Sequence, residues 1–241
     1  MKAVEAWHSD RIEQEMRLVR WGAVGVPVLL FPTAGGDAEE AERFGLIDSI
    51  APLMAAGRIK VYSVDSGAGR SWTRKDDPRH SMWLQNQFDA VIREEVVPAI
   101  RADCRDDSTE IVTAGASIGA FWALEVICRH ADVFRLAICM SGSYDLSDRL
   151  HGHWNDDFYF SSPLHYLPDL DDGWELDMLR SRFVVLACGQ GRWEDPGESW
   201  RVAHVLGERG IPNRVDLWSH DHDHDWPTWR EMLPLYLDDM A

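Results

Sequence analysis

Short, continuous runs of apolar residues recur along the chain and predict buried strands. These runs span residues 27–32, 59–66, 109–112, 134–142, 183–189 and 214–218. Residues 12–22 instead alternate between polar and apolar side chains. That alternation predicts an edge strand in antiparallel pairing, with one face toward water.

Segments with helical character lie between these runs. They span residues 38–47, 80–102, 121–128, 174–182, 198–210 and 226–240. Pro98 falls inside the second segment and predicts a kink or an early stop, because proline has no N–H for the helical ladder. Residues 67–75 are expected to form a loop. Residues 143–172 are expected to form an irregular, aromatic and acidic excursion over a functional site.

Strands that alternate with helices indicate a mostly parallel sheet covered by helices on both faces. The 241 residues, 45% of them hydrophobic, suffice for one substantial domain and are few for two. We therefore expect a single α/β domain over residues 1–241, without a separate lid domain. Functional groups in such sheets gather at the carboxyl ends of the strands.

A Gly-x-Ser-x-Gly motif, formed by Gly115, Ser117 and Gly119, stands between a predicted strand and a predicted helix. Strand, tight turn and helix form the setting of a nucleophile elbow. The serine there must adopt a strained backbone conformation that projects its hydroxyl above the sheet. Glycine belongs on both sides, since longer side chains would collide across the turn. Ser117 is therefore predicted to be a nucleophile.

A serine hydroxyl needs an adjacent base to become a good nucleophile. Three histidines, His220, His222 and His224, follow the last predicted strand. His224 lies nearest to the last helix, where the base is expected, and His220 is the second choice. The acid should follow the strand that ends at residue 189, where Glu194 and Asp195 are both available. A carboxylate there would fix the histidine tautomer and stabilise the imidazolium.

Acyl transfer also requires N–H donors for the oxyanion of the tetrahedral intermediate. The Ile118 N–H, directly after the predicted nucleophile, is one candidate. The second is expected in the turn at residues 33–35, with the Ala34 N–H preferred, because glycine there allows close approach of the backbone. Three aromatic side chains, Trp72, Trp122 and Trp193, are candidate walls of a substrate pocket.

The net charge of −17 narrows the choice of partners. A field of this sign repels phosphate backbones and anionic membranes, so neither a nucleic-acid partner nor membrane association is expected. No apolar run reaches membrane-spanning length and no secretory signal is visible, so we expect a cytoplasmic protein. The four cysteines are widely spaced, without a CxxC pair, which is typical of core thiols in a reducing compartment.

Histidine and aspartate alternate over residues 220–225, which could place three imidazoles on one face of an extended segment. Such a set could bind zinc or nickel. Because the predicted nucleophile already requires one of these histidines as its base, we expect neither a metal ion nor another cofactor.

Four segments carry a resemblance to a known family: residues 25–33, 115–119, 159–167 and 224–230, the last with His-Asp-Trp followed by Trp-Arg. In these segments the chain resembles the putative-esterase family of α/β hydrolases. That family includes esterase D-like enzymes (S-formylglutathione hydrolases), feruloyl esterases and mycolyltransferases. The resemblance implies the α/β-hydrolase fold and His224 as the base. It also implies that glutamate is acceptable as the acid, so Glu194 is preferred and Asp195 is the alternative.

Together these features predict a serine hydrolase that cleaves small-molecule carboxylic esters. Ser117 would attack the acyl carbon, His224 would transfer the proton and Glu194 would orient the imidazole. Two alternatives stay open: acyl transfer to an alcohol acceptor, and a non-catalytic interaction protein that keeps the fold. The acyl group, the alcohol and the oligomeric state are left open by the sequence.

Overall fold

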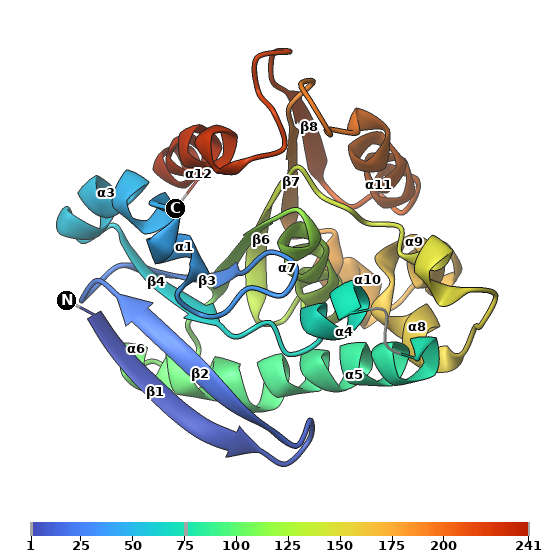
Figure 1. Ribbon diagram of the computed structural model, residues 1–241, viewed down its shortest axis with the longest axis horizontal. Helices are drawn as coiled ribbons and strands as arrows, with labels where there is room; N and C mark the ends of the chain where they lie inside the picture. Colours follow the sequence, from blue (N-terminus) through green and yellow to red (C-terminus); the bar gives the residue numbers. More distant parts are fainter. Residues whose placement is uncertain (1, 75–76, 241) are drawn as a thin grey trace.

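A computed structural model describes residues 2–74 and 77–240, which build one eight-stranded sheet between helices (Figure 1). The strand order is β1-β2-β4-β3-β5-β6-β7-β8. Antiparallel pairing joins β1 (Lys2–Ser9) to β2 (Gln14–Trp21), and β2 to β4 (Ile59–Val64). Parallel pairing joins β4 to the other strands in turn: β3 (Val26–Phe31), β5 (Ile111–Ala116), β6 (Phe134–Met140), β7 (Phe183–Cys188) and β8 (Asn213–Leu217). The expected mostly parallel sheet is confirmed.

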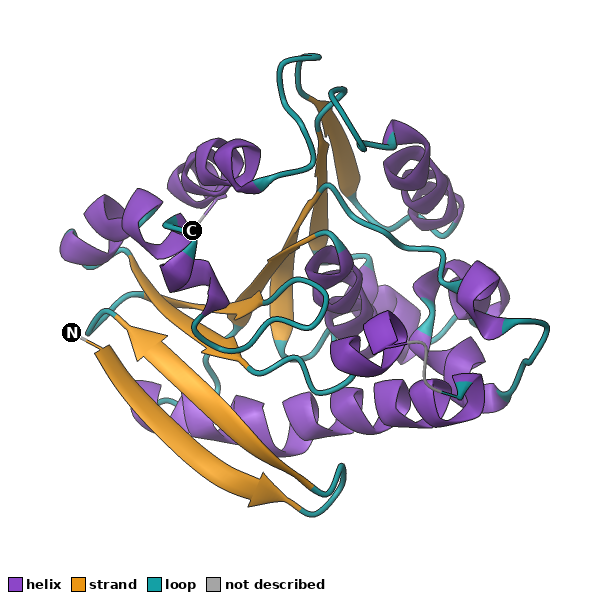
Figure 2. Ribbon diagram, viewed as in Figure 1, coloured by secondary structure: helices purple, strands orange, loops and turns teal. Residues whose placement is uncertain are grey.

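Helices cover both faces of the sheet, as Figure 2 shows. One face packs against α1 (Glu40–Arg43), α2 (Leu46–Ser49), α3 (Ala51–Ala55) and α12 (Trp226–Met240). The other packs against α4 (Gly69–Arg74), α5 (Pro78–Val91), α6 (Val97–Cys104), α7 (Ile118–Arg129), α10 (Trp174–Leu179) and α11 (Pro196–Glu208). The side chains of β3 pack alternately against the helices on one face and on the other, because successive residues of a strand point to opposite faces.

The sequence pattern missed β1, and it wrongly placed β2 at the edge of the sheet. β1 pairs with β2 alone, and most of its residues are exposed or half-buried. An edge strand of this kind is under little pressure to alternate polar and apolar residues, so its sequence carries a weak signal. β2 lies between β1 and β4, as the second strand of the sheet.

Three further segments differ from expectation. In place of the single helix expected at residues 38–47, the chain forms the two short helices α1 and α2, because Gly45 adopts a left-handed conformation (φ 74°) between them. Most of the loop expected at residues 67–75 is the helix α4, while Lys75 lies outside the described residues. The expected excursion at residues 143–172 contains short helices: η2 (Ser147–Leu150), α8 (Asp156–Ser161), α9 (Pro163–Tyr166) and η3 (Leu167–Asp169).

The disturbance predicted at Pro98 takes the form of a π-helical segment. This segment, η1 (Ile92–Val96), joins α5 to α6. A proline ring clashes with the carbonyl four residues before it, and the wider π turn relieves that crowding. Ile92 and Val96 stay fully buried, so the chain keeps its apolar face toward the core through the irregularity.

The parallel strands place the turns after β3, β5, β6, β7 and β8 at one edge of the sheet, since the strands all run the same way. Every residue predicted to take part in the chemistry lies in one of these turns or directly after it. Among the described residues, no helix combines the length and the apolar character that a membrane span requires.

Candidate active site

Ser117 lies in the turn between β5 and α7, with φ 57° and ψ −126°. Residues other than glycine rarely adopt this conformation, which costs free energy unless the surroundings enforce it. Backbone hydrogen bonds do so: the Ser117 N–H donates to the Met140 carbonyl (3.0 Å), and its carbonyl accepts from Ala120 (3.1 Å) and Ser143 (3.3 Å). The side chain is half-buried at the carboxyl edge of the sheet. The strained backbone expected for an elbow is present.

Both motif glycines are required by close backbone contacts. A Cβ atom on Gly115 would lie 2.2 Å from the Gly119 carbonyl oxygen. A Cβ atom on Gly119 would lie 2.7 Å from the Pro32 carbonyl oxygen and 2.8 Å from that of Phe31. The elbow therefore packs directly against the end of β3, where the second oxyanion donor was expected.

Gly119→Ala is expected to destabilise the fold by about 1–3 kcal/mol, because its methyl group must displace backbone atoms that have no free rotation. Gly207→Ala is the matched control, since it lies in α11 with no atom within 4 Å of the added Cβ. That variant should gain about 0.5–1 kcal/mol from reduced backbone entropy in the unfolded chain. Urea unfolding of both variants measures the difference; equal stability would contradict the tight packing of the elbow.

Glu194 and His224 come together from the loops after β7 and β8. Glu194 Oε2 lies 3.5 Å from His224 Nδ1, and the glutamate side chain is only 1% exposed. The Ser141 hydroxyl donates to Glu194 Oε1 (2.6 Å), and the Cys188 thiol donates to Oε2 (3.3 Å). The His224 side chain is 23% exposed, and its ring meets the edge of Trp229 at 5.3 Å between centroids. The contact through Nδ1 leaves Nε2 as the nitrogen available to a reacting hydroxyl.

The electrostatics of this pair keep the acid ionised. Burial alone would raise the pKa of Glu194, but hydrogen bonds with His224 and Ser141 outweigh it and hold that pKa below its ordinary value of 4.5. Burial raises the pKa of the neighbouring Cys188 thiol, so the thiol stays protonated and can donate. The imidazole of His224 therefore faces a carboxylate at neutral pH.

Asp195, the alternative acid, has a different task. Its side chain caps the N-terminus of α11 by accepting from the Gly197 N–H (2.9 Å). A short polar side chain in this position satisfies one of the free N–H groups of the first turn. The structure thus brings Glu194, and not its neighbour, to the histidine.

The other two histidines of the cluster also have separate contacts. His220 Nδ1 lies 3.0 Å from the Gln190 carbonyl oxygen. His222 Nδ1 lies 2.8 Å from Ser219 Oγ, and its Nε2 lies 3.3 Å from a Glu231 carboxylate oxygen. Within the described ranges, no three His, Cys, Asp or Glu side chains are grouped so that they could hold a metal ion.

The predicted oxyanion donors flank the elbow. Ile118 is the first residue of α7, so its N–H belongs to the first-turn groups that have no acceptor inside the helix. Ala34 is exposed in the turn after β3, and its N–H meets no acceptor in the described part of the chain. The Ser117 hydroxyl forms no hydrogen bond to another described residue, so the predicted hydrogen bond between Ser117 and His224 is not present. Hydrogen bonds between catalytic groups often tighten only in the complex with substrate.

The three tryptophans predicted to line a pocket lie in different surroundings. Trp122 is fully buried against Phe31 and Phe88, so it offers no open surface and we do not retain it as a pocket wall. Trp72 is buried too, but it borders a pocket of about 120 Å³. Trp193 is 78% exposed, next to the acid, with the Arg192 guanidinium 5.2 Å from its ring centroid.

Ser141 is a site residue that the sequence analysis missed. It follows β6 with a positive φ of 47°, donates to Glu194 and accepts from the Trp229 indole N–H (3.0 Å). Its hydroxyl thereby ties the acid to α12, the helix that follows His224 in the chain. The available signal was its place among small residues at the carboxyl end of a predicted strand.

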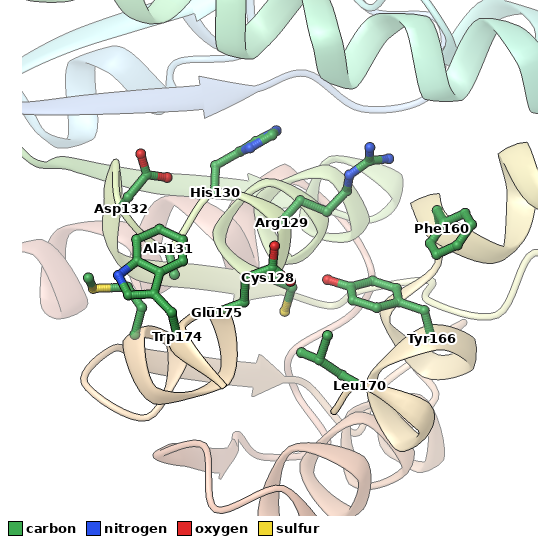
Figure 3. A pocket seen from close by; sticks show the side chains of 11 residues that line it. Cys128, Arg129, His130, Ala131, Asp132, Phe160, Tyr166, Leu170, Trp174 and Glu175 are labelled. Carbon is green, nitrogen blue, oxygen red and sulfur yellow. The ribbon is translucent and has the colours of Figure 1, made fainter. Parts of the chain in front are cut away.

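A pocket of about 290 Å³ lies elsewhere, at the C-terminal end of α7 (Figure 3). Residues 128–132 line it together with Phe160, Tyr166, Leu170, Trp174, Glu175 and Met178. Ser117 precedes the opposite end of the same helix, whose length is about 18 Å. This pocket is therefore separate from the candidate active site.

The family model described as "Putative esterase" matches residues 46–240. No curated protein sequence matches the chain. Among solved structures, a ferulic acid esterase is similar with a TM-score of 0.75 and 17% identity, over 98% of this chain and 96% of that one.

Two further solved structures share the architecture. An S-formylglutathione hydrolase from Agrobacterium tumefaciens has a TM-score of 0.73 at 13% identity, over 99% of this chain and 92% of that one. FphF, a fluorophosphonate-binding serine hydrolase from Staphylococcus aureus, has a TM-score of 0.66 at 15% identity, over 100% and 98%. At such identities the likeness establishes the fold, and the α/β-hydrolase fold expected from the sequence is confirmed.

The family match spans well over half of the chain and includes the elbow, the acid loop and the histidine loop. The protein therefore belongs to the putative esterase family, and the expectation of a carboxylic ester hydrolase is confirmed.

Proposed function

We propose that this protein hydrolyses small-molecule esters through an acyl-enzyme on Ser117. His224 acts as general base, Glu194 orients it, and the N–H groups of Ile118 and Ala34 hold the oxyanion. The observation that carries this proposal is the buried, ionised Glu194 in contact with His224 Nδ1. A carboxylate in this position selects the tautomer that leaves Nε2 free to accept a proton.

The relation of this pair to the nucleophile supports the proposal. The Ser117 N–H donates to the Met140 carbonyl, and the next residue, Ser141, donates to Glu194. Two hydrogen bonds on adjacent residues thus link the elbow to the acid, which contacts the base. The strained backbone of Ser117 adds a second reason, since such strain is typical of functional sites.

The chemistry follows in two steps. Ser117 Oγ attacks the acyl carbon while its proton passes to His224 Nε2, and the two amides stabilise the charge on the carbonyl oxygen. The tetrahedral intermediate collapses, and the leaving alkoxide takes the proton from His224. Water then attacks the acyl-enzyme with His224 as base again, which releases the carboxylic acid and restores the serine.

A fluorophosphonate probe tests the nucleophile directly. Wild-type protein is expected to take up one equivalent of label on the peptide that carries Ser117, and Ser117→Ala should take up none. Ser108→Ala, which removes an exposed serine hydroxyl, is the matched control and should label fully. Label on another residue, or none in folded wild-type protein, refutes the proposal. A panel of p-nitrophenyl esters then defines the acyl group, and added alcohols separate hydrolysis from acyl transfer.

A further inference from the structure

Glu40 is a buried carboxylate beside the turn that carries Ala34. Its Oε2 accepts a hydrogen bond from the Thr33 N–H (2.7 Å), and its Oε1 accepts from the Thr33 hydroxyl (2.8 Å). Both carboxylate oxygens of Glu40 thus accept hydrogen bonds from Thr33, the residue directly before Ala34. The mechanism proposed above gives Glu40 no part.

The turn is shaped to receive this carboxylate. A Cβ atom on Gly36 would overlap the Glu40 carboxylate where it now lies, so glycine at this position leaves room for the carboxylate beside the turn. The Gly36 N–H donates to the Thr33 carbonyl (3.0 Å), and Gly35 takes the positive φ of 75° that the turn needs. Thr33 is therefore held at its N–H, its hydroxyl and its carbonyl at once.

These contacts determine the direction of the next N–H group. In a trans peptide the N–H points opposite to the carbonyl of the same unit. The Thr33 carbonyl points into the turn toward Gly36, so the Ala34 N–H of that peptide points out of it. Any rotation of Thr33 would swing the Ala34 N–H away from its direction.

We infer that Glu40 is a positioning residue of the oxyanion hole: it clamps Thr33 and so aims the Ala34 N–H at the acyl oxygen. This inference rests on the proposed function. A misplaced donor weakens the transition state more than the bound substrate, because the oxyanion develops only during the reaction. Glu40 therefore acts on kcat and has little influence on KM.

The charge of Glu40 does not stabilise the fold at neutral pH. Burial raises the pKa of Glu40 above its ordinary value, although the Thr33 N–H and hydroxyl both oppose the shift. A carboxyl group whose pKa is raised by folding lowers the stability of the folded state as the pH rises above the unfolded value. At neutral pH a neutral amide in the same place should therefore be at least as stable as the acid.

Three variants separate positioning from general stability. Glu40→Gln keeps an acceptor for the Thr33 N–H and a partner for the hydroxyl, which can turn to accept. Glu40→Leu keeps similar volume and removes both hydrogen bonds. Glu39→Leu is the matched control on the adjacent residue, whose carboxylate contacts Lys2 and Arg17 instead of the turn.

The readouts are kcat and KM for a p-nitrophenyl ester, and inhibition by a trifluoromethyl ketone, whose adduct places an oxyanion in the same donors. Glu40→Leu is expected to lower kcat about 10- to 100-fold, with KM within about threefold and Ki raised by the same factor as the loss in kcat. Glu40→Gln should stay within about threefold of wild type and unfold at no lower urea concentration. Glu39→Leu should match wild type.

Unchanged kcat in folded Glu40→Leu, or an equal loss in Glu39→Leu, overturns the inference. If Glu40→Leu does not fold, Thr33→Val carries the test, because it removes the hydroxyl contact alone. It should lower kcat about 3- to 10-fold at constant KM, and unchanged kcat would again overturn the inference. Wild-type protein that neither hydrolyses esters nor labels at Ser117 refutes the proposed function itself, a result that these variants cannot mimic.

Discussion

His224→Ala should lower kcat by at least about 10⁴-fold, whereas His220→Ala and His222→Ala should stay within a few fold of wild type. Without its imidazole the site has no base to take the serine proton, and a serine hydroxyl alone is a poor nucleophile at neutral pH. Of the three clustered histidines, only His224 contacts a buried carboxylate. His220 faces a backbone carbonyl, and His222 faces Ser219 and Glu231.

The measurement is kcat and KM of each variant on a short-chain p-nitrophenyl ester, with circular dichroism to verify folding. The double variant Ser117→Ala/His224→Ala serves as an internal check. It should be no slower than either single variant, since residues that act as one unit lose their effects together. If His220→Ala lost as much kcat as His224→Ala, the assignment of His224 as the base would be wrong.

Glu194→Gln is expected to lower kcat by about 10⁴-fold, with KM little changed. The glutamine amide can donate to Nδ1, which selects the tautomer whose Nε2 carries the proton and cannot act as base. Asp195→Asn is the matched control, because it changes the neighbouring carboxylate in the same way while asparagine still caps α11. Similar losses in both variants would contradict the assignment of the acid.

Wild type and Glu194→Gln should also differ in how their stability depends on pH. Folding lowers the pKa of Glu194 from its ordinary value of 4.5, so the ionised form is favoured in the folded state. The stabilisation is fully present above that ordinary value and is lost as the pH falls through the folded value. The stability difference between wild type and Glu194→Gln should thus be constant near neutral pH and should shrink below about pH 4.5. Urea unfolding at a series of pH values measures it; a difference that grows on acidification would refute the lowered pKa.

The position of the nucleophile could be predicted because its requirements are local. An elbow needs a strand, a strained residue between two glycines and a helix, all within a short stretch of chain. The structure shows the physical reason for the glycines in contacts between Gly115, Gly119 and the end of β3. The parallel sheet was predictable for a similar reason, since buried strands and helices differ in the period of their apolar residues.

Residues that meet from separate loops could not be chosen in this way. The sequence offered two adjacent carboxylates and three histidines; position favoured His224, and only the family resemblance favoured Glu194 over Asp195. Only the folded chain shows that one side chain turns inward to His224 while the other caps a helix. The surroundings of the tryptophans were equally hard to predict. Trp122 is buried and Trp193 is exposed, although both are large aromatic residues near predicted site residues.

The sequence by itself determined the fold class, the elbow at Ser117 and the family. Each of these depends on short stretches of chain, in which the apolar pattern and the backbone requirements of neighbouring residues are visible. Only the tertiary structure decided which acid faces His224, that Ser141 supports it, and that Glu40 clamps the turn before Ala34. Glu40 and Thr33 both lie in the segment that follows β3. The contacts of Glu194 with His224 and Ser141 join turns after different strands. They exist only because the strand order places those turns at one edge of the sheet.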